Sequence, residues 1–297
     1  MSLVINHNMA AMNAARNLNE HYSRLYRSTQ RLSSGLRVNT AADDAAGLAI
    51  RELQRAEIAT LRQGSRNAAD AISLIQTADG ALQVIDEKLI RMKELAEQAA
   101  TGTYDSTQRL MIESEYQAMA SEITRIANAT AFNGVKLLDG TLSGIPHDGT
   151  GLVSKGQLKI HFGPSNHSAE DYYYISIGCA TASAFGLGNQ SYPADAGFCV
   201  STQSAAQHAL DAINLAIVSK DKIRAALGAI QNRLENTITN LNIQAENLQA
   251  AESRISDVDV ATEMTEFVRN QILTQAAVAM LAQANSLPRM AMNLIGG

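Results

Sequence analysis

Residues 68–99 read AADAISLIQTADGALQVIDEKLIRMKELAEQA. Apolar or small side chains recur in this stretch at alternating intervals of three and four residues. They are Ala68, Ala71, Ile75, Ala78, Leu82, Ile85, Leu89, Met92, Ala96 and Ala99. That spacing places them along one side of an α-helix, in the pattern of a coiled-coil seam. Because a helix of this length spans about 48 Å, it needs an equally long partner to cover the seam.

A second stretch, far along the chain, has a matching pattern. Its seam consists of Ile223, Leu227, Ile230, Leu234, Ile238, Leu241, Ala245 and Leu248. We expect the two stretches to pair and so to join the two halves of the chain in a rod. The alternative is that both are ordinary amphipathic helices in the core of a globular bundle.

Composition limits both the fold and the function. The chain has 297 residues and a formal net charge of −5, and its four prolines all lie beyond residue 145. Since proline in a helix interior costs about 3 kcal/mol, their absence before that point fits long helices. The acidic balance argues against a general nucleic-acid binder. The sequence shows no membrane-spanning segment and no cleaved signal peptide, which by the ordinary rules predicts a cytosolic protein.

The chain ahead of the long helix is predicted to form a helix of its own. Its seam is Ala11, Ala15, Leu18, Tyr22, Leu25, Thr29, Leu32 and Leu36. The run Ser33-Ser34-Gly35 indicates where this helix stops. Its arginines far outnumber its one acidic residue, Glu20, so the arm is basic within an acidic protein. Thr40 with Asp43 then predicts an N-cap that opens the long helix near Asp44.

The remaining elements follow from turn and capping signals. We expect the long helix to end at Ala100, and Asp105 with Gln108 predicts a capping box that opens a further helix. From Phe132 the composition changes to turn dipeptides, such as Asn133-Gly134, and to short runs of β-forming residues. The sequence therefore predicts a small β-rich insert, after which Ser204 with Gln207 and then Ser256 with Asp259 open two more helices.

The last helix is apolar on more than one face. Its apolar residues include Val260, Met264, Phe267, Ile272, Leu273, Val278, Met280 and Leu281. A lone terminal helix cannot bury side chains on several sides, so it needs partners. Its acidic first turns could pair with the basic N-terminal arm of the same chain or with neighbouring copies. The predicted fold is mainly α: a long antiparallel coiled-coil rod formed by the N- and C-terminal halves, with the β-rich insert in the middle.

Long motifs in both halves closely resemble bacterial flagellin. In the first half they are LSSGLRVNTAADDAAGLAI from Leu32, SRNAADAISLIQTADGAL from Ser65 and FNGVKLLDG from Phe132. In the second half they are GAIQNRLENTITNL, ESRISDVDVATEM and QILTQAAVAMLAQANSLP. The resemblance covers about residues 1 to 140 and 205 to 297. A hook-associated junction protein, which shares terminal helices with flagellin, is the alternative that these long matches weigh against.

The resemblance implies a structural subunit that polymerises into the flagellar filament. It assigns 1–40 and 257–297 to an inner tube domain, 41–140 and 205–256 to an outer tube domain, and 141–204 to a small variable region. It also implies export, unfolded, through the flagellar type III channel to an extracellular filament. The expected partners are other copies, an export chaperone, and the filament cap and hook-junction proteins, with no cofactor, nucleic acid or membrane. The candidate self-assembly residues are Leu18, Leu25, Leu32, Met264, Phe267, Leu273 and Leu281.

Two further groups of residues are candidates for a site. Arg91, Leu95 and Glu115 fall where immune-stimulating flagellins contact the host Toll-like receptor; Arg91 and Glu115 could equally form a solvated pair or contact neighbouring subunits. Cys179 and Cys199 could form one disulfide or stay reduced. An enzyme built on this scaffold would need a zinc site among the histidines and cysteines of the insert. The HExxH spacing of a zinc peptidase is absent from the sequence.

Overall fold

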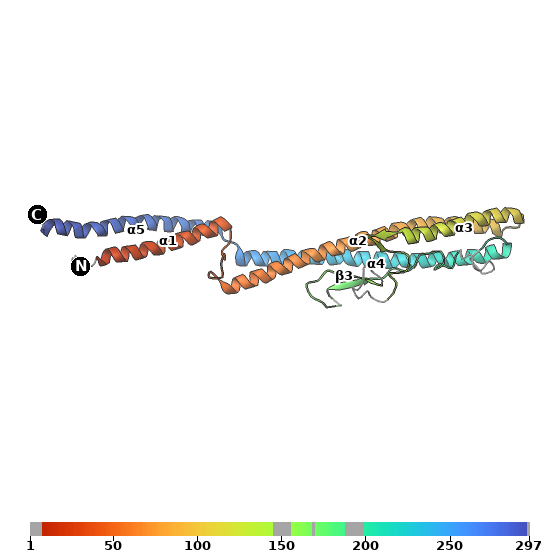
Figure 1. The fold of residues 1–297 in the computed structure, drawn as a ribbon, viewed down its shortest axis with the longest axis horizontal. Helices are drawn as coiled ribbons and strands as arrows, with labels where there is room; N and C mark the ends of the chain where they lie inside the picture. The colour runs from red at the N-terminus through yellow and green to blue at the C-terminus, as the bar shows by residue number, and fades with distance from the viewer. Residues whose placement is uncertain (1–7, 145–155, 168–169, 188–198, 296–297) are drawn as a thin grey trace. The chain divides into compact units, whose positions relative to one another are not determined.

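The computed structural model describes residues 8–144, 156–167, 170–187 and 199–295 (Figure 1). Within them the chain forms five helices: α1 (Met9–Ser34), α2 (Ala45–Ala100), α3 (Ser106–Ala129), α4 (Gln203–Ser256) and α5 (Val260–Ile295). Four short strands lie between α3 and α4: β1 (Ala131–Phe132), β2 (Val135–Lys136), β3 (Leu158–His161) and β4 (Tyr172–Ile175). The prediction of a mainly helical fold with a small β insert is confirmed.

The chain divides into two compact units. The terminal unit comprises Met1–Ile58 and Glu246–Gly297, and the central unit comprises Ala59–Ala245. Both divisions fall inside the long helices α2 and α4. The terminal unit contains α1 and α5, whereas the central unit contains α3, the strands and most of α2 and α4.

The core of the central unit lies where α2, α3 and α4 pack together (Figure 1). Each of the ten residues predicted for the α2 seam is at most 2% exposed. On α4 the predicted partner positions Leu227 and Leu234 are buried in the same core. Lys220 binds Asp86 at 2.5 Å and Arg224 binds Asp79 at 2.7 Å, so residue numbers rise along α4 as they fall along α2. The two long helices are therefore antiparallel partners, as the spacing predicts.

Helix boundaries agree with several of the predicted signals. Gly35 ends α1 with φ 71°, a left-handed conformation that glycine adopts without a Cβ penalty, and its N–H donates to the Arg31 carbonyl. Asp105 and Gln108 form the capping box that opens α3. Asp259 opens α5, because its carboxylate accepts hydrogen bonds from the backbone and hydroxyl of Thr262.

Helix α2 begins at Ala45, next to the predicted start near Asp44, but the capping residues predicted for α2 and α4 are wrong by a few residues. The α2 cap is Asp44, whose Oδ1 accepts the Gly47 N–H at 2.9 Å, while Asp43 instead accepts hydrogen bonds from Thr40 within the preceding turn. Helix α4 begins at Gln203, and its cap is Thr202, whose hydroxyl accepts the Ala205 N–H. Thr202 lies two residues before the predicted cap, Ser204. In both places several polar residues stand in a row, and sequence spacing does not show which one adopts the cap conformation.

The insert consists of two small antiparallel hairpins. Strands β1 and β2 are joined by Asn133 and Gly134, both at positive φ, as expected for an Asn-Gly turn. Strands β3 and β4 pair from Leu158 opposite Ile175 to His161 opposite Tyr172. Both predicted β segments, 158–162 and 172–177, contain one of these strands.

Candidate assembly interface

Helices α1 and α5 of the terminal unit pack against each other in opposite directions. Asn8, before α1, donates from its side chain to the Ala284 carbonyl near the far end of α5, and Arg31 binds Glu263 at 3.5 Å near the other end. The less exposed residues of α5 recur at intervals of four and three. They are Glu263, Phe267, Asn270, Thr274, Ala277, Leu281 and Ala284. The pair is therefore a short antiparallel coiled coil.

The seam between α1 and α5 is unusually polar. Its most buried side chains include Ser28 on α1 and Glu263, Asn270 and Thr274 on α5, all at most 9% exposed. Thr274 donates its hydroxyl to the Asn270 carbonyl of its own helix, a bond that adds nothing across the seam. The large apolar side chains of the seam, such as Leu25 and Phe267, are only half-buried. Because burial of apolar surface supplies most of the stabilisation of a coiled coil, this seam holds the two helices only weakly.

Large apolar side chains of α5 are exposed around the helix everywhere outside its seam with α1. Eight large apolar residues of α5 are exposed to between 38% and 65%: Val260, Met264, Val268, Ile272, Leu273, Val278, Met280 and Met290. Ile272 lies two residues from both Asn270 and Thr274 of the seam, which puts it on the opposite side of the helix. The others cover the same side and the two flanks of the seam, and we call the whole set the α5 outer face. Exposed apolar surface of this extent is the mark of an interaction site.

The predicted assembly residues divide between the two sides of the helix pair. Leu18, Leu25 and Leu32 on α1 are half-buried at intervals of seven residues. Phe267 and Leu281 on the α5 seam are half-buried as well. Met264 and Leu273 are instead 43% and 38% exposed on the α5 outer face.

Sequence reasoning placed Tyr22 and Thr29 in the α1 seam, but both are exposed. Their neighbours lie in the seam instead, His21 half-buried and Ser28 buried. Sequence reasoning also passed over Val268, which is exposed on the α5 outer face. Steps of three and four residues that started from the leucines led to Tyr22 and Thr29 and missed the polar positions beside them. A strict seven-residue repeat that tolerates His, Asn and Thr would have found the polar seam.

The connections that lead into α2 and out of α4 are tied together. The backbone N–H of Arg37 donates to the Ser256 carbonyl at 2.6 Å, and that of Val258 donates to the Gly35 carbonyl at 3.0 Å. The Arg37 guanidinium adds a bond to the Ile255 carbonyl. Two segments more than 200 residues apart in sequence thus form a small antiparallel bridge at the base of the terminal helices.

The candidate receptor residues do not form one surface. Arg91 and Glu115 join α2 to α3 through an exposed ion pair at 2.8 Å, and hydrogen bonds to Glu115 and to Glu94 raise the pKa of Arg91. Leu95 is 1% exposed and belongs to the hydrophobic core. The expectation that the Leu95 side chain contacts a receptor is therefore wrong for this fold, because a core side chain offers a partner no surface.

The cysteines and histidines of the insert do not come together. Both cysteines lie among the described residues and no disulfide joins them, so the disulfide that the sequence allowed is not formed. The Cys179 sulfur instead lies 3.2 Å from the Thr181 hydroxyl. His161 stacks against Tyr172, and His147 lies outside the described residues. Over the part of the chain that the structure describes, no group of three or more His, Cys, Asp or Glu side chains could hold a metal ion.

Comparisons with known proteins decide the family. The model of the bacterial flagellin N-terminal helical region matches residues 5–143, and that of the C-terminal helical region matches residues 210–295. The chain belongs to the bacterial flagellins.

A flagellin of Halalkalibacterium halodurans is 42% identical over 99% of this chain and 100% of the relative. The flagellar filament 33 kDa core protein of Treponema phagedenis is 40% identical over 99% and 100% of the two chains. The crystal structure of Bacillus cereus flagellin is 28% identical and covers 63% of this chain and 94% of its own, with a TM-score of 0.47.

As a flagellin, the chain is a structural subunit of the bacterial flagellar filament, the extracellular part of the flagellum. Its family is one of structural proteins. Among the described residues, no helix combines the length and the apolar character needed to cross a membrane.

Proposed function

We propose that the α5 outer face is the surface on which neighbouring subunits pack when this flagellin polymerises. The observation that carries the proposal is that α5 turns polar side chains toward α1 and exposes Val268, Ile272 and Met280 instead. A monomer gains nothing from that arrangement, because the apolar side chains stay in water. A helical polymer brings other copies alongside each α5 and buries them.

This packing also suggests where each segment of the chain lies in the filament. Residues 1–40 and 257–297 form the inner tube of the filament, residues 41–140 and 205–256 form the outer tube, and residues 141–204 make the variable outer region. The apolar surface of α5 supports the inner position, since side chains exposed in the monomer need cover on several sides.

The route to the filament and its partners are inferred from the family. The subunit travels unfolded through the flagellar type III export channel without a cleaved signal peptide, held beforehand by an export chaperone. It is added beneath the filament cap, next to hook-junction proteins, and it acts as a structural element and not as an enzyme. The weak α1–α5 seam supports passage in an unfolded state, because little folding free energy has to be lost in that unit.

Recognition by a host Toll-like receptor is a narrower proposal. It now rests on Arg91 and Glu115 alone, whose side chains are about half exposed on α2 and α3. An interface arginine of this kind is a frequent hot spot in protein complexes. Contacts between subunits would compete for the same surface, so the monomer is the form that binds.

The substitution Ile272→Asp tests the assembly role of the α5 outer face. An unpaired carboxylate buried between subunits costs about 3 kcal/mol or more, which raises the critical concentration for polymerisation about a hundredfold. Ile272 is 60% exposed in the monomer, so thermal unfolding of the monomer should not change. The matched control, Ile272→Val, keeps the site apolar and should polymerise normally. Sedimentation of polymerised protein measures both, and normal filaments of Ile272→Asp would remove the proposed role.

A further inference from the structure

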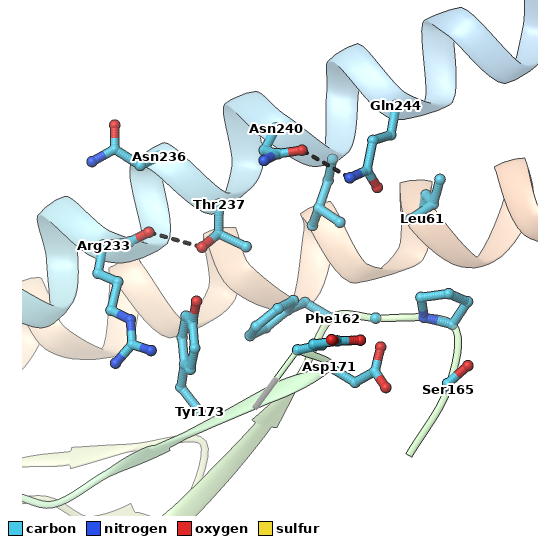
Figure 2. Close-up of a pocket in the computed structure, with 14 residues that line it drawn as sticks. Leu61, Phe162, Ser165, Asp171, Tyr173, Arg233, Asn236, Thr237, Asn240 and Gln244 are labelled. Atoms are coloured by element: carbon cyan, nitrogen blue, oxygen red, sulfur yellow. Dashed lines mark hydrogen bonds between the residues drawn. The ribbon is translucent and has the colours of Figure 1, made fainter. Parts of the chain in front are cut away.

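A hollow of about 570 Å³ lies between the β3–β4 hairpin and helices α2 and α4 of the central unit (Figure 2). Leu61 and Phe162 line it from α2 and from the end of β3, and Tyr173 lines it from β4. On α4 the lining includes Arg233 and Thr237, which Figure 2 shows one turn apart on the side that faces the hairpin. The hollow thus collects residues from three distant parts of the sequence.

The walls of this hollow are held in place by direct contacts. At Gly64 the backbone of Phe162 lies so close to α2 that an added Cβ would stand 1.9 Å from the Phe162 carbonyl oxygen. The Asn67 side chain donates to the neighbouring His161 carbonyl at 2.9 Å. The Asp171 carboxylate accepts the His167 N–H at 2.8 Å and closes the loop that follows β3. A binding site framed in this way is largely preformed.

Its lining combines an apolar floor with charges of both signs, Arg233 on α4 and Glu170 and Asp171 ahead of β4. Leu61, Phe162 and Leu241 are at most 6% exposed and form the floor. The Arg233 guanidinium lies 3.6 Å over the ring of Tyr173, and no carboxylate among the described residues forms an ion pair with it. Arginine stacked on an aromatic ring keeps its N–H edge available for a carboxylate. The complement of the Arg233 side of the hollow, as distinct from the Glu170 and Asp171 side, is a projecting segment with an acidic residue next to apolar side chains.

An open polymer requires two different surfaces that fit each other, because a contact between identical patches closes into a dimer. The hollow lies near Leu61, and α2 continues from there to Ala100, about 58 Å away at 1.5 Å per residue. At that far end the Thr101–Asp105 turn joins α2 to α3. The hollow and the turn are therefore a recess and a projection at opposite ends of the central unit.

The Thr101–Asp105 turn presents an acidic residue beside apolar side chains, which matches the Arg233 side of the hollow. Asp105 is exposed at its tip, and Leu110 and Met111 are 59% and 69% exposed at the start of α3. The turn is also rigid, because Arg109 donates to the Ala99 carbonyl at 3.0 Å and to the Thr101 carbonyl at 2.8 Å. A rigid projection with a carboxylate and apolar neighbours loses little entropy when it enters a preformed recess.

We propose that the Thr101–Asp105 turn of one copy docks in the hollow of the next copy, with Asp105 against Arg233. The contact is heterologous and repeats from subunit to subunit, as a filament requires. This inference rests on the proposed assembly function and names one contact within it. It is independent of the α5 outer face, since every residue involved lies in the central unit.

A double-mutant cycle tests the charge pair. Asp105→Asn removes the charge and keeps an N-cap residue, so α3 stays intact. Each of Asp105→Asn and Arg233→Gln should raise the critical concentration for polymerisation about tenfold, and the double variant should be no worse than either, because all three lose the same contact. Arg125→Gln, which removes an exposed arginine paired with Glu122 of its own helix, is the control and should polymerise normally. Additive effects, or no effect of either single change, would overturn the proposal.

Cross-linking within the filament tests the geometry. In a chain that carries Cys179→Ala and Cys199→Ala, Thr103→Cys is combined with Thr237→Cys, which lines the hollow, or with Thr239→Cys, which does not. Mild oxidation should link the filament into covalent multimers only in the first combination. Intact filaments that link in neither, or equally in both, would overturn this contact alone. Failure of the unsubstituted chain to polymerise would overturn the assembly function, and this inference with it.

Discussion

Replacing Gly64 by alanine should destabilise the protein, although helix propensity alone predicts the reverse. Gly64 lies inside α2, where alanine is favoured over glycine by about 1 kcal/mol. The same helix contains Gly80, and an added Cβ there would meet nothing within 4 Å. Gly64→Ala and Gly80→Ala are the same substitution in the same helix. They differ only in the atoms that the added methyl group would contact.

The expected cost at Gly64 comes from the β3–β4 hairpin. The Phe162 carbonyl oxygen would be 1.9 Å from the new methyl group, and it belongs to backbone that cannot rotate away. If the hairpin lifts, the burial of Phe162, now 3% exposed, is lost at about 1.5–3 kcal/mol, together with about 1 kcal/mol for the bond from Asn67 to the His161 carbonyl. After the gain in propensity is subtracted, Gly64→Ala should lower the free energy of unfolding by about 1.5–3 kcal/mol.

Urea unfolding monitored by circular dichroism gives both free energies, and hydrogen exchange locates the effect. Gly80→Ala should raise the free energy of unfolding by up to about 1 kcal/mol. Gly64→Ala should lower it and speed exchange of the β3 and β4 amides before those of α2. If Gly64→Ala stabilised the protein as much as Gly80→Ala does, the hairpin would not contact α2 at this point. Phe162 would then not line the hollow as described.

Three more outcomes are expected. Burial by itself would lower the pKa of Lys220, but hydrogen bonds to Asp221 and Asp86 raise it above its ordinary value. The charged Lys220 therefore stabilises the folded protein fully below about pH 10.4, and this contribution is lost at higher pH. The difference in free energy of unfolding between wild type and Lys220→Met should accordingly be constant below that pH and change above it. In dilute monomer, amides of residues 262–284 should exchange far faster than those of residues 75–95, and equal protection would show that the terminal pair is stable alone. Arg91→Ala should weaken receptor binding by monomer roughly tenfold or more, and equal affinity of both monomers would end the receptor proposal.

The long helices were predictable because local spacing and packing agree. The seam from Ala68 to Ala99 contains only apolar or small residues, so any packing of α2 has to bury it. Arg224 and Asp79, which help to fix the α2–α4 register, could not be paired from sequence, because the positions that face each other depend on how two helices 145 residues apart align.

The terminal pair was harder to read for a different reason. Hydrophobicity predicted that α5 needs several partners, and this is consistent with its exposed apolar side chains. It could not tell which face α1 takes, since the chosen face includes Asn270 and Thr274, and a seam built from such residues resembles a solvent face. The hollow beside Arg233 had no sequence signal at all. It exists because Gly64 lacks a side chain and the backbone at Phe162 of the insert packs directly against it. That contact depends on how two distant segments fold together, which the sequence of neither segment shows.

The bridge between Arg37 and Ser256 has a mechanical consequence. A pull on α1 reaches the start of α2 through the covalent chain, and it reaches the end of α4 through hydrogen bonds less than one turn away. Tension or torque on either terminal helix is therefore shared by both long helices before the weak α1–α5 seam has to bear any of it. A rotating filament applies such forces to each of its subunits. Because the bridge couples both connections, it keeps α1 and α5, the least stable part of the molecule, from being separated by a force on one helix alone.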